Sequence, residues 1–213
     1  MKMTMTRHRE HCMVCGSQLL YLQVAEDLTC ASCGSRWQGH IKCPGGHALC
    51  DSCHGRESRK ATEGIALTDP SPDPVEIAER MLSDPFLPML SCDHAFIAAG
   101  ALLAALRNSP YGKVTDQEVR EVFERTAKQA QGGFCGLTGV CGIVPAVGAV
   151  FSVFLSARCG SDHEQRIVME AVTRVSRAIA DLTGPSCCKA YVRAAVAAAA
   201  SMFSEKFGII LPA

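Results

Sequence analysis

Apolar positions in the second two thirds of the chain recur with the spacing of α-helices. Thr115 and Glu118 form a capping box, the signature of a helix start. The residues that then share one helix face are Val119, Val122, Phe123 and Thr126. Further helices are predicted over residues 75–83, 94–108, 162–182 and 186–207. Because no segment after residue 60 alternates with the period of a strand, residues 74–213 are predicted to form an all-helical domain.

One uncharged run, residues 136–157, is long enough to cross a bilayer. Gly139, Gly142, Pro145 and Gly148 interrupt it, and its neighbours are amphipathic segments that can cover an apolar helix. We therefore expect a buried core helix here and no membrane partner.

The stretch just before this domain shows no periodicity. Residues 61–73 lead into the sequence DPSPDP, whose three prolines disfavour helix. A linker is therefore predicted over 61–73. This linker separates the helical domain from a first module of residues 1–60.

Composition changes the picture for this first module. Seven of the chain's 13 cysteines lie between residues 12 and 54, where apolar residues are few. The total is odd, and residues 1–10 lack the apolar stretch of a secretory signal, so we expect a cytoplasmic protein with reduced thiols. Metal bonds are expected to replace a hydrophobic core, in a small zinc-ribbon or treble-clef-like fold.

The spacing of these cysteines is typical of zinc sites. Cys12, Cys15 and Gly16 form one C-x2-C-G turn, and a second such turn begins at Cys30 after a stretch of hairpin length. Each turn can present two thiolates to one ion, and the glycine relieves backbone strain.

A third cluster completes a second ligand set, with His54 as a substitute ligand or a supporting residue. The predicted metal ligands are Cys12, Cys15, Cys30, Cys33, Cys43, His47, Cys50 and Cys53, enough for two zinc ions. Consecutive use, with the first four residues on one ion, is preferred because those four make a ribbon unaided. Interleaved use is the alternative, and iron is an alternative metal for a four-sulfur site.

The charge of the chain argues against one class of partner. It has 21 Lys and Arg against 21 Asp and Glu, so it generates no field that would attract a polyanion over a distance. Nucleic acid is an unlikely partner.

The other six cysteines lie at junctions between the predicted helices. Cys135 and Cys141 lie among five glycines, and Cys187 and Cys188 begin a helix beside Lys189, where the helix dipole and the lysine would favour thiolate. These four thiols are predicted to hold zinc, iron, an iron–sulfur cluster or a labile disulfide. Cys159 is expected to be buried as a small apolar side chain.

A further cysteine, Cys92, precedes Asp93 and His94 at the start of another helix. If the junctions converge, they form a thiol-rich cleft. An enzyme could then use Cys187 or Cys188 as nucleophile, with His94 as base and Asp93 to orient it.

The order of these motifs is similar to that of an uncharacterised family of cysteine-rich domains. The C-x2-C-G turns, GHALCDSCH, GGFCGLTGVCG and GPSCCK carry the resemblance, which spans about residues 12–189. Such domains occur alone or joined to SAM-dependent methyltransferases, so the resemblance implies a metal-bearing partner of methyl-transfer or redox pathways. The chain departs from the family pattern where MLSCDHA stands in place of Met-His-Gly-Pro-Glu-His-His, and where Ala190 replaces an arginine after Lys189.

Three functions therefore stay open. The first is a metal-binding accessory protein of a redox or methyl-transfer pathway. The second is a non-catalytic zinc-dependent adaptor that binds a partner protein, such as a methyltransferase or a redox protein. The third is a thiol-dependent enzyme, for which the sequence contains no complete catalytic motif.

Overall fold

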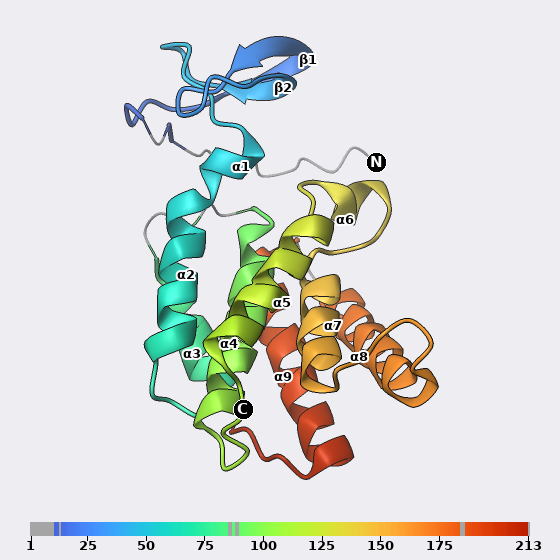
Figure 1. Ribbon diagram of the computed structural model, residues 1–213. Coiled ribbons are helices and arrows are strands. Elements are labelled where there is room, and N and C mark those ends of the chain that lie inside the picture. The colour runs from blue at the N-terminus through green and yellow to red at the C-terminus, as the bar shows by residue number, and fades with distance from the viewer. Residues whose placement is uncertain (1–10, 13, 85–86, 88–89, 184–185, 213) are drawn as a thin grey trace. The chain divides into compact units, whose positions relative to one another are not determined.

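The computed structural model describes residues 11–212 except residues 13, 85–86, 88–89 and 184–185. Gly184 and Pro185 of the GPSCCK motif and Met89 of the MLSCDHA segment thus lie outside the described residues. The chain divides into two compact units, Met1–Arg56 and Glu57–Ala213. It is mostly helical, with one small two-stranded sheet (Figure 1).

The sheet belongs to the first unit. Strands β1 (Leu20–Thr29) and β2 (Arg36–Lys42) pair antiparallel, with an irregularity in the register after Tyr21. The short helix α1 (Asp51–His54) follows. The buried apolar side chains described in this unit are Cys12, Leu28, Cys30, Cys43 and Ala48. Three of them are cysteines, so too little hydrocarbon is buried to stabilise the unit by packing alone.

The second unit consists of helices joined by loops, and its described residues contain no strand. The helices are α2 (Arg56–Thr68), α3 (Pro74–Leu82), α4 (Asp93–Asn108), α5 (Asp116–Gln129), α6 (Phe134–Leu137), α7 (Ile143–Phe154), α8 (Asp162–Ala180) and α9 (Cys188–Phe207). The helical character predicted for this part of the chain is confirmed.

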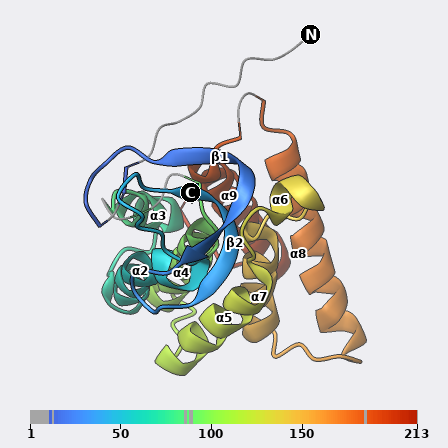
Figure 2. The same ribbon diagram turned by 90° about the horizontal axis from the view of Figure 1, so that it is seen from above.

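Helix α4 lies at the centre of the second unit. Every residue from Asp93 to Leu106 is buried, and α3, α5, α7 and α9 pack around the helix (Figure 2). Helix α8 packs on α7 and α9 from outside. Aromatic rings join α7 to α9, where Phe151 stacks on Phe203 with 4.3 Å between ring centroids. An all-round apolar helix requires such an all-round coat.

Local signals fix the helix starts as the sequence predicts. Thr115 Oγ1 accepts a hydrogen bond from the Glu118 amide at 3.2 Å, and the Glu118 carboxylate accepts one from the Thr115 amide at 2.8 Å. The predicted buried face of this helix is confirmed, because Val119, Val122, Phe123 and Thr126 are its buried residues. Asp73 caps α3 in a similar way.

The uncharged run contains a shorter buried helix than predicted. Helix α7 begins at Ile143, and residues 131–140 are all exposed. Gly133 and Gly139 adopt left-handed backbone angles, each with φ +80°, which interrupt a continuous helix. The prediction of a buried helix is correct for 143–154 and wrong for 136–142 and 155–157. Across the described part of the chain, no helix combines the length and the apolar character that crossing a membrane requires.

The predicted linker over 61–73 is also wrong in part, because α2 continues through Thr68. The prolines all follow that residue, and Ala66 is buried in the core of the unit. Only residues 69–73 connect α2 to α3. Asp69 within this connection accepts hydrogen bonds from Arg80 at 2.6 and 2.7 Å, so the connection is held to α3.

Two helical glycines give a matched test of this packing. A methyl group on Gly148 of α7 would lie 2.8 Å from Val172 Cγ2 of α8, whereas one on Gly64 of α2 would meet nothing within 4 Å. We expect Gly148→Ala to lower the free energy of unfolding by about 1–3 kcal/mol through overpacking. Gly64→Ala should raise it by up to about 1 kcal/mol through helix propensity. Urea unfolding followed by circular dichroism measures both, and an unchanged Gly148 variant would contradict the close approach of α7 and α8.

Candidate metal centre

Two groups of side chains in the first unit are arranged as metal sites. Site A consists of Cys12, Cys15, Cys43 and His47, and site B consists of Cys30, Cys33, Cys50 and Cys53. Within each group the potential ligand atoms all lie within 4.8 Å of one another. These are the same eight side chains that the sequence predicts as ligands, and His54 belongs to neither group.

The candidate ligands are grouped in interleaved order, so the preferred consecutive order is wrong. Strand pairing explains why, because Leu20 at the start of β1 lies opposite Lys42 at the end of β2. The first C-x2-C turn and Cys43 are therefore at one end of the hairpin. Cys30 follows β1 at the other end, and ten strand residues span up to roughly 30 Å, too far for one ion to bind both turns.

A second backbone contact returns the chain to site B. Residue Ala48 forms a parallel bridge with Cys30, and the Ala31 amide donates to the Ala48 carbonyl at 2.8 Å. The chain is then two residues from Cys50, which lies next to the second C-x2-C turn. Cys33 Sγ and Cys50 Sγ are 3.7 Å apart.

Both C-x2-C turns share one backbone geometry. The Cys12 amide donates to the Ser17 carbonyl at 2.8 Å, and the Gly16 amide donates to the Cys12 carbonyl at 2.7 Å. The same two bonds recur within residues 30–35, at 2.8 and 2.9 Å. Gly16 and Gly34 have φ +72° and +74°, a conformation that most residues avoid. The glycines thus close turns whose two thiols face the same side.

The interatomic distances fit a tetrahedral zinc ion. Zn–S and Zn–N bonds of usual length imply S···S edges of about 3.8 Å and S···N edges of about 3.6 Å. In site A, Cys43 Sγ lies 3.5 Å from both Cys15 Sγ and His47 Nδ1, and Cys12 Sγ lies 3.9 Å from His47 Nδ1. A disulfide requires about 2.05 Å. These sulfurs are therefore arranged as ligands of an ion and are not bonded to each other.

The surroundings of the thiols in each site push their pKa values apart. Hydrogen bonds from Ser17 lower the pKa of Cys15 to about 6. For Cys53 the largest single influence, a hydrogen bond from Ser32, lowers the pKa, but burial and the neighbouring thiols together raise it to about 11. Four thiolates repel one another without a cation, so a divalent ion would stabilise the set.

Site B has a further charged neighbour, Arg56, that the sequence analysis missed. Its Nη2 donates to Cys53 Sγ at 3.0 Å. Arg56 is the first residue of α2, where the helix dipole disfavours a cation. A divalent ion bound by four thiolates has a net charge of −2, and the Arg56 guanidinium offsets part of this charge. Site A has His47 in place of one thiolate, so it would carry less negative charge. The arginine three residues after Cys53 was the available signal.

The helical unit brings together a different set of thiols from the predicted one. The thiol of Cys188 has Cys92, Cys135 and Cys141 as electrostatic neighbours, whereas Cys187 interacts with Arg193. Cys92, which was not among the four predicted thiols, thus also influences the Cys188 thiol. Within the described residues, only sites A and B gather three or more potential ligand atoms within 4.8 Å, so the helical thiols are more loosely grouped.

The expectation that the start of α9 favours thiolate is wrong for Cys188. Burial is the main cause that raises the pKa of Cys188 to about 11, and burial also raises the pKa of Cys141. The Lys189 ammonium is not available to the thiol, because it donates to the Leu82 carbonyl at 2.9 Å. Cys159, expected to be buried, is exposed.

Asp93 and His94 are both buried, but they do not form the predicted base and orienter. The Asp93 carboxylate pairs with Arg59 at 2.6 Å. His94 Nδ1 donates to the Ser91 carbonyl at 3.0 Å, and burial lowers the His94 pKa. His94 Nε2 is buried with no hydrogen-bond partner among the described residues. The imidazole is therefore neutral, with its basic nitrogen inside the protein.

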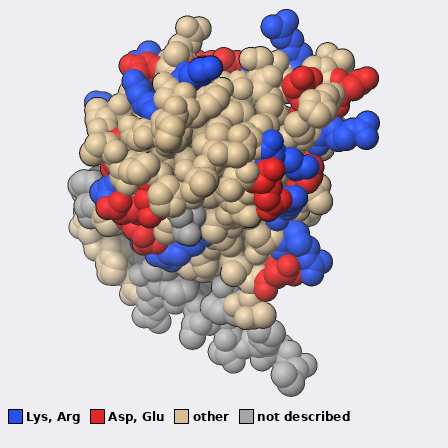
Figure 3. All heavy atoms as spheres, turned by 90° about the horizontal axis from the view of Figure 1, so that it is seen from below, with Lys and Arg blue, Asp and Glu red and all other residues tan. Residues whose placement is uncertain are grey.

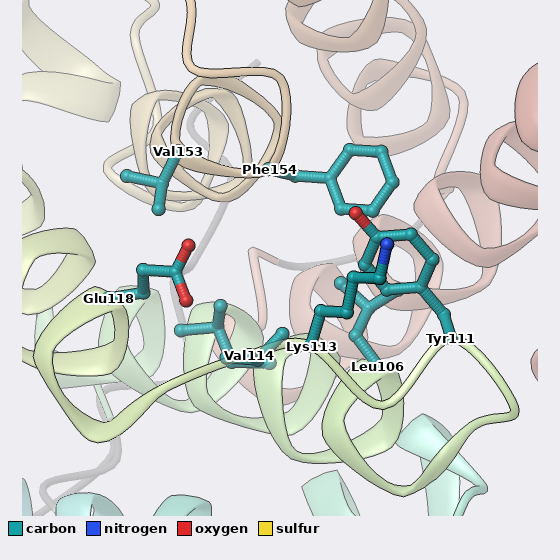
Figure 4. Close-up of a pocket in the computed structure, with 8 residues that line it drawn as sticks. Leu106, Tyr111, Lys113, Val114, Glu118, Val153 and Phe154 are labelled. Atoms are coloured by element: carbon teal, nitrogen blue, oxygen red, sulfur yellow. The ribbon is translucent and has the colours of Figure 1, made fainter.

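A small pocket of the helical unit lies away from these thiols (Figure 4). Its volume is about 40 Å³, and Leu106, Tyr111, Lys113, Glu118 and Phe154 are among its lining residues. Ligand pockets usually measure about 300–1,000 Å³. This pocket has room for water and not for a metabolite, and no cysteine lines it.

The surface charges of the helical unit offset one another. Figure 3 shows a face on which acidic and basic side chains are interspersed around a broad neutral area. Ion pairs between helices contribute to this mixture, such as Arg174 with Glu205 at 2.6 Å. This face does not provide the one-signed charge that nucleic acid binding requires.

Comparison with known proteins gives one match. A protein-family model matches residues 62–213, and its description is "Family of unknown function (DUF5714)". The cysteines of sites A and B precede the matched residues. No curated protein matches the chain. No solved structure matches it.

The role of Arg56 can be tested by substitution. We expect Arg56→Ala to weaken metal binding at site B by about 10–100-fold, the usual effect of losing a residue that supports a ligand. Removing an arginine from a helix start should itself stabilise α2, so weaker binding would not reflect a lost helix. Competition with a chromophoric chelator measures the affinity. Lys60→Ala, an exposed cation of the same helix, is the control, and equal affinities in the two variants would contradict the proposed role.

Proposed function

The chain belongs to this family of unknown function, and we propose from its geometry that it is a metal-binding accessory protein whose N-terminal module is folded by two zinc ions. The observation that carries the proposal is the pair of interleaved ligand sets. Each set supplies four protein ligands and leaves no open position, which is typical of structural zinc and not of catalytic zinc.

Energetics support the same role. The first unit buries few apolar side chains, whereas structural zinc contributes about 10–16 kcal/mol to the folding of small modules. Zinc suits the mixed sulfur and nitrogen set of site A, while the all-sulfur site B also suits ferrous iron. We assign zinc to both, because one module with two closed tetrahedral sites needs no redox-active metal.

A paired substitution tests both the zinc ions and the interleaved order. Cys12→Ser/Cys43→Ser removes two ligands from site A and none from site B, so we expect the loss of one zinc equivalent. Cys12→Ser/Cys30→Ser is the matched control, since it removes one ligand from each site and should weaken both. Metal analysis and the absorption of the cobalt-substituted chains measure the outcome. Loss of both ions in the first variant, or a module that stays folded in excess chelator, would overturn the proposal.

The helical unit gives less support to a thiol-dependent enzyme than to an accessory protein. The raised pKa values of Cys141 and Cys188 keep these thiols protonated at neutral pH, and a protonated thiol is a poor nucleophile. Asp93 pairs with Arg59 and so does not orient His94. We therefore rank a thiol-dependent enzyme below an accessory role in a redox or methyl-transfer pathway.

A specific observation favours the adaptor as a second candidate. The hairpin of the zinc module exposes Leu20, Tyr21, Val24 and Ile41, and Tyr21 lies opposite Ile41 across the strands. Val24 is 76% exposed. Exposed apolar side chains on a small metal-stabilised sheet are suited to contact with a partner protein. The partner suggested by the sequence resemblance is a SAM-dependent methyltransferase.

The adaptor role has its own test. We expect Val24→Glu to weaken binding to a SAM-dependent methyltransferase of the same cell by at least about tenfold, because a charge would enter an apolar contact. Gln23→Glu, which adds the same charge at the neighbouring exposed residue, should bind as the unaltered chain does. Titration calorimetry measures the affinities, with zinc content determined in parallel. An unaltered chain that forms no complex with the methyltransferase would contradict this role.

A further inference from the structure

Three chain segments that are distant in sequence converge at one end of the helical unit. They are the start of α4, the loop 130–142 and the start of α9. Cys92 Sγ donates to the Gln131 carbonyl at 3.0 Å, and a methyl group placed on Gly142 would lie 3.3 Å from the same sulfur. The Ser91 amide hydrogen bonds to the Cys188 thiol. Each segment thus carries at least one thiol to the junction.

We propose that this junction is a third metal site, for a thiophilic divalent ion such as zinc or ferrous iron, with Cys92, Cys135, Cys141 and Cys188 as its ligands. The site goes beyond the two structural zinc ions proposed above and does not depend on them. Four sulfur ligands from three segments would tie the exposed loop to the starts of α4 and α9.

The exposure of the four thiols suits a site that an ion can enter. Cys92, Cys141 and Cys188 are half-buried and Cys135 is exposed. An ion could not reach sulfurs inside the apolar core, and sulfurs spread over an open surface would not all face one ion.

Electrostatics explain why such a group favours a cation. Grouped thiolates repel one another, and a divalent cation bound between them removes that repulsion. Binding exchanges four S–H bonds for four metal–sulfur bonds and releases four protons to the solvent. His94 is neutral and the Lys189 ammonium is bound to the Leu82 carbonyl, so neither repels an incoming ion strongly.

The loop supplies the movement that binding requires. No three of the four thiols lie within ligand distance of one another, so the loop that carries Cys135 and Cys141 must close around the ion. Cys135 lies on α6 in an exposed stretch, between Gly133 and Gly139 with their left-handed backbone angles. This stretch also exposes Leu137, at 77%. Because it packs little against the core, it can close over an ion without disturbing the helices.

His94 supports the junction from inside. Its Nδ1 donates to the Ser91 carbonyl, and the amide of the same residue bonds to Cys188. The imidazole thereby fixes the segment that carries Cys92. We assign it a positioning role, because no contact between its Nε2 and the thiols is present among the described residues.

Adjacent cysteines provide a matched test. We expect the full chain, prepared without oxygen and loaded with zinc, to bind three equivalents, and Cys188→Ser to bind two. Cys187→Ser should still bind three, since its thiol faces Arg193. Cys135→Ser/Cys141→Ser should also bind two equivalents. When loaded with cobalt, this variant should lack the thiolate-to-cobalt charge-transfer absorption of one site of the unaltered chain.

The outcomes separate this proposal from that of the zinc module. Two equivalents in the unaltered chain, both lost on substitution at sites A and B, would overturn the third site and leave the module intact. Equal metal content in the Cys187 and Cys188 variants would also overturn it. Acid-labile sulfide in the purified protein would indicate an iron–sulfur cluster in place of a single ion, and would likewise contradict the proposal. If only the Cys12 and Cys30 substitutions lower the number of bound metal equivalents, the third site is overturned and the zinc module is not.

Discussion

The length of one strand pair determines how the N-terminal module can bind metal. Because β1 and β2 run antiparallel, each end of the hairpin holds one C-x2-C turn, and neither turn can reach the other. Each must find its remaining ligands in the segment that follows β2. That segment supplies Cys43 and His47 at one end and, after the bridge of Ala48 to Cys30, Cys50 and Cys53 at the other. Every other feature of the module, including its small core and its positive-φ glycines, is compatible with this division.

The same balance of charge acts in both units of the protein. Grouped thiols repel one another once ionised, so their protons are retained unless a hydrogen-bond donor or a cation compensates. In site B the compensation comes partly from Arg56, which occupies a helix position that is electrostatically unfavourable for it. In the helical unit, burial outweighs the backbone hydrogen bonds that the Cys141 and Cys188 thiols accept, so the pKa values of these two thiols rise.

Local signals in the sequence predicted much of the fold. The Thr115–Glu118 capping box and its buried face were predictable because both depend on residues within two helical turns. The linker and the start of α7 were predicted wrongly at their edges, since the prolines all follow Thr68 and the left-handed Gly139 interrupts an apolar run. The eight side chains that form the two candidate metal sites could be predicted from their spacing alone. Their pairing was not, because it depends on strand register, and the pKa of Cys188 was not, because it depends on burial by segments far away in sequence.

Interleaving has a consequence for how the module forms during synthesis. With consecutive ligands, a first ion would be enclosed as soon as residue 33 had left the ribosome. Here the nascent chain must extend to His47 before either site has four ligands, and to Cys53 before the second does. Under the proposed function, the two ions would therefore be acquired almost together, after more than thirty residues of this segment have been synthesised. Metal supply in the cell, and not only chain sequence, would then determine how quickly the new module becomes stable.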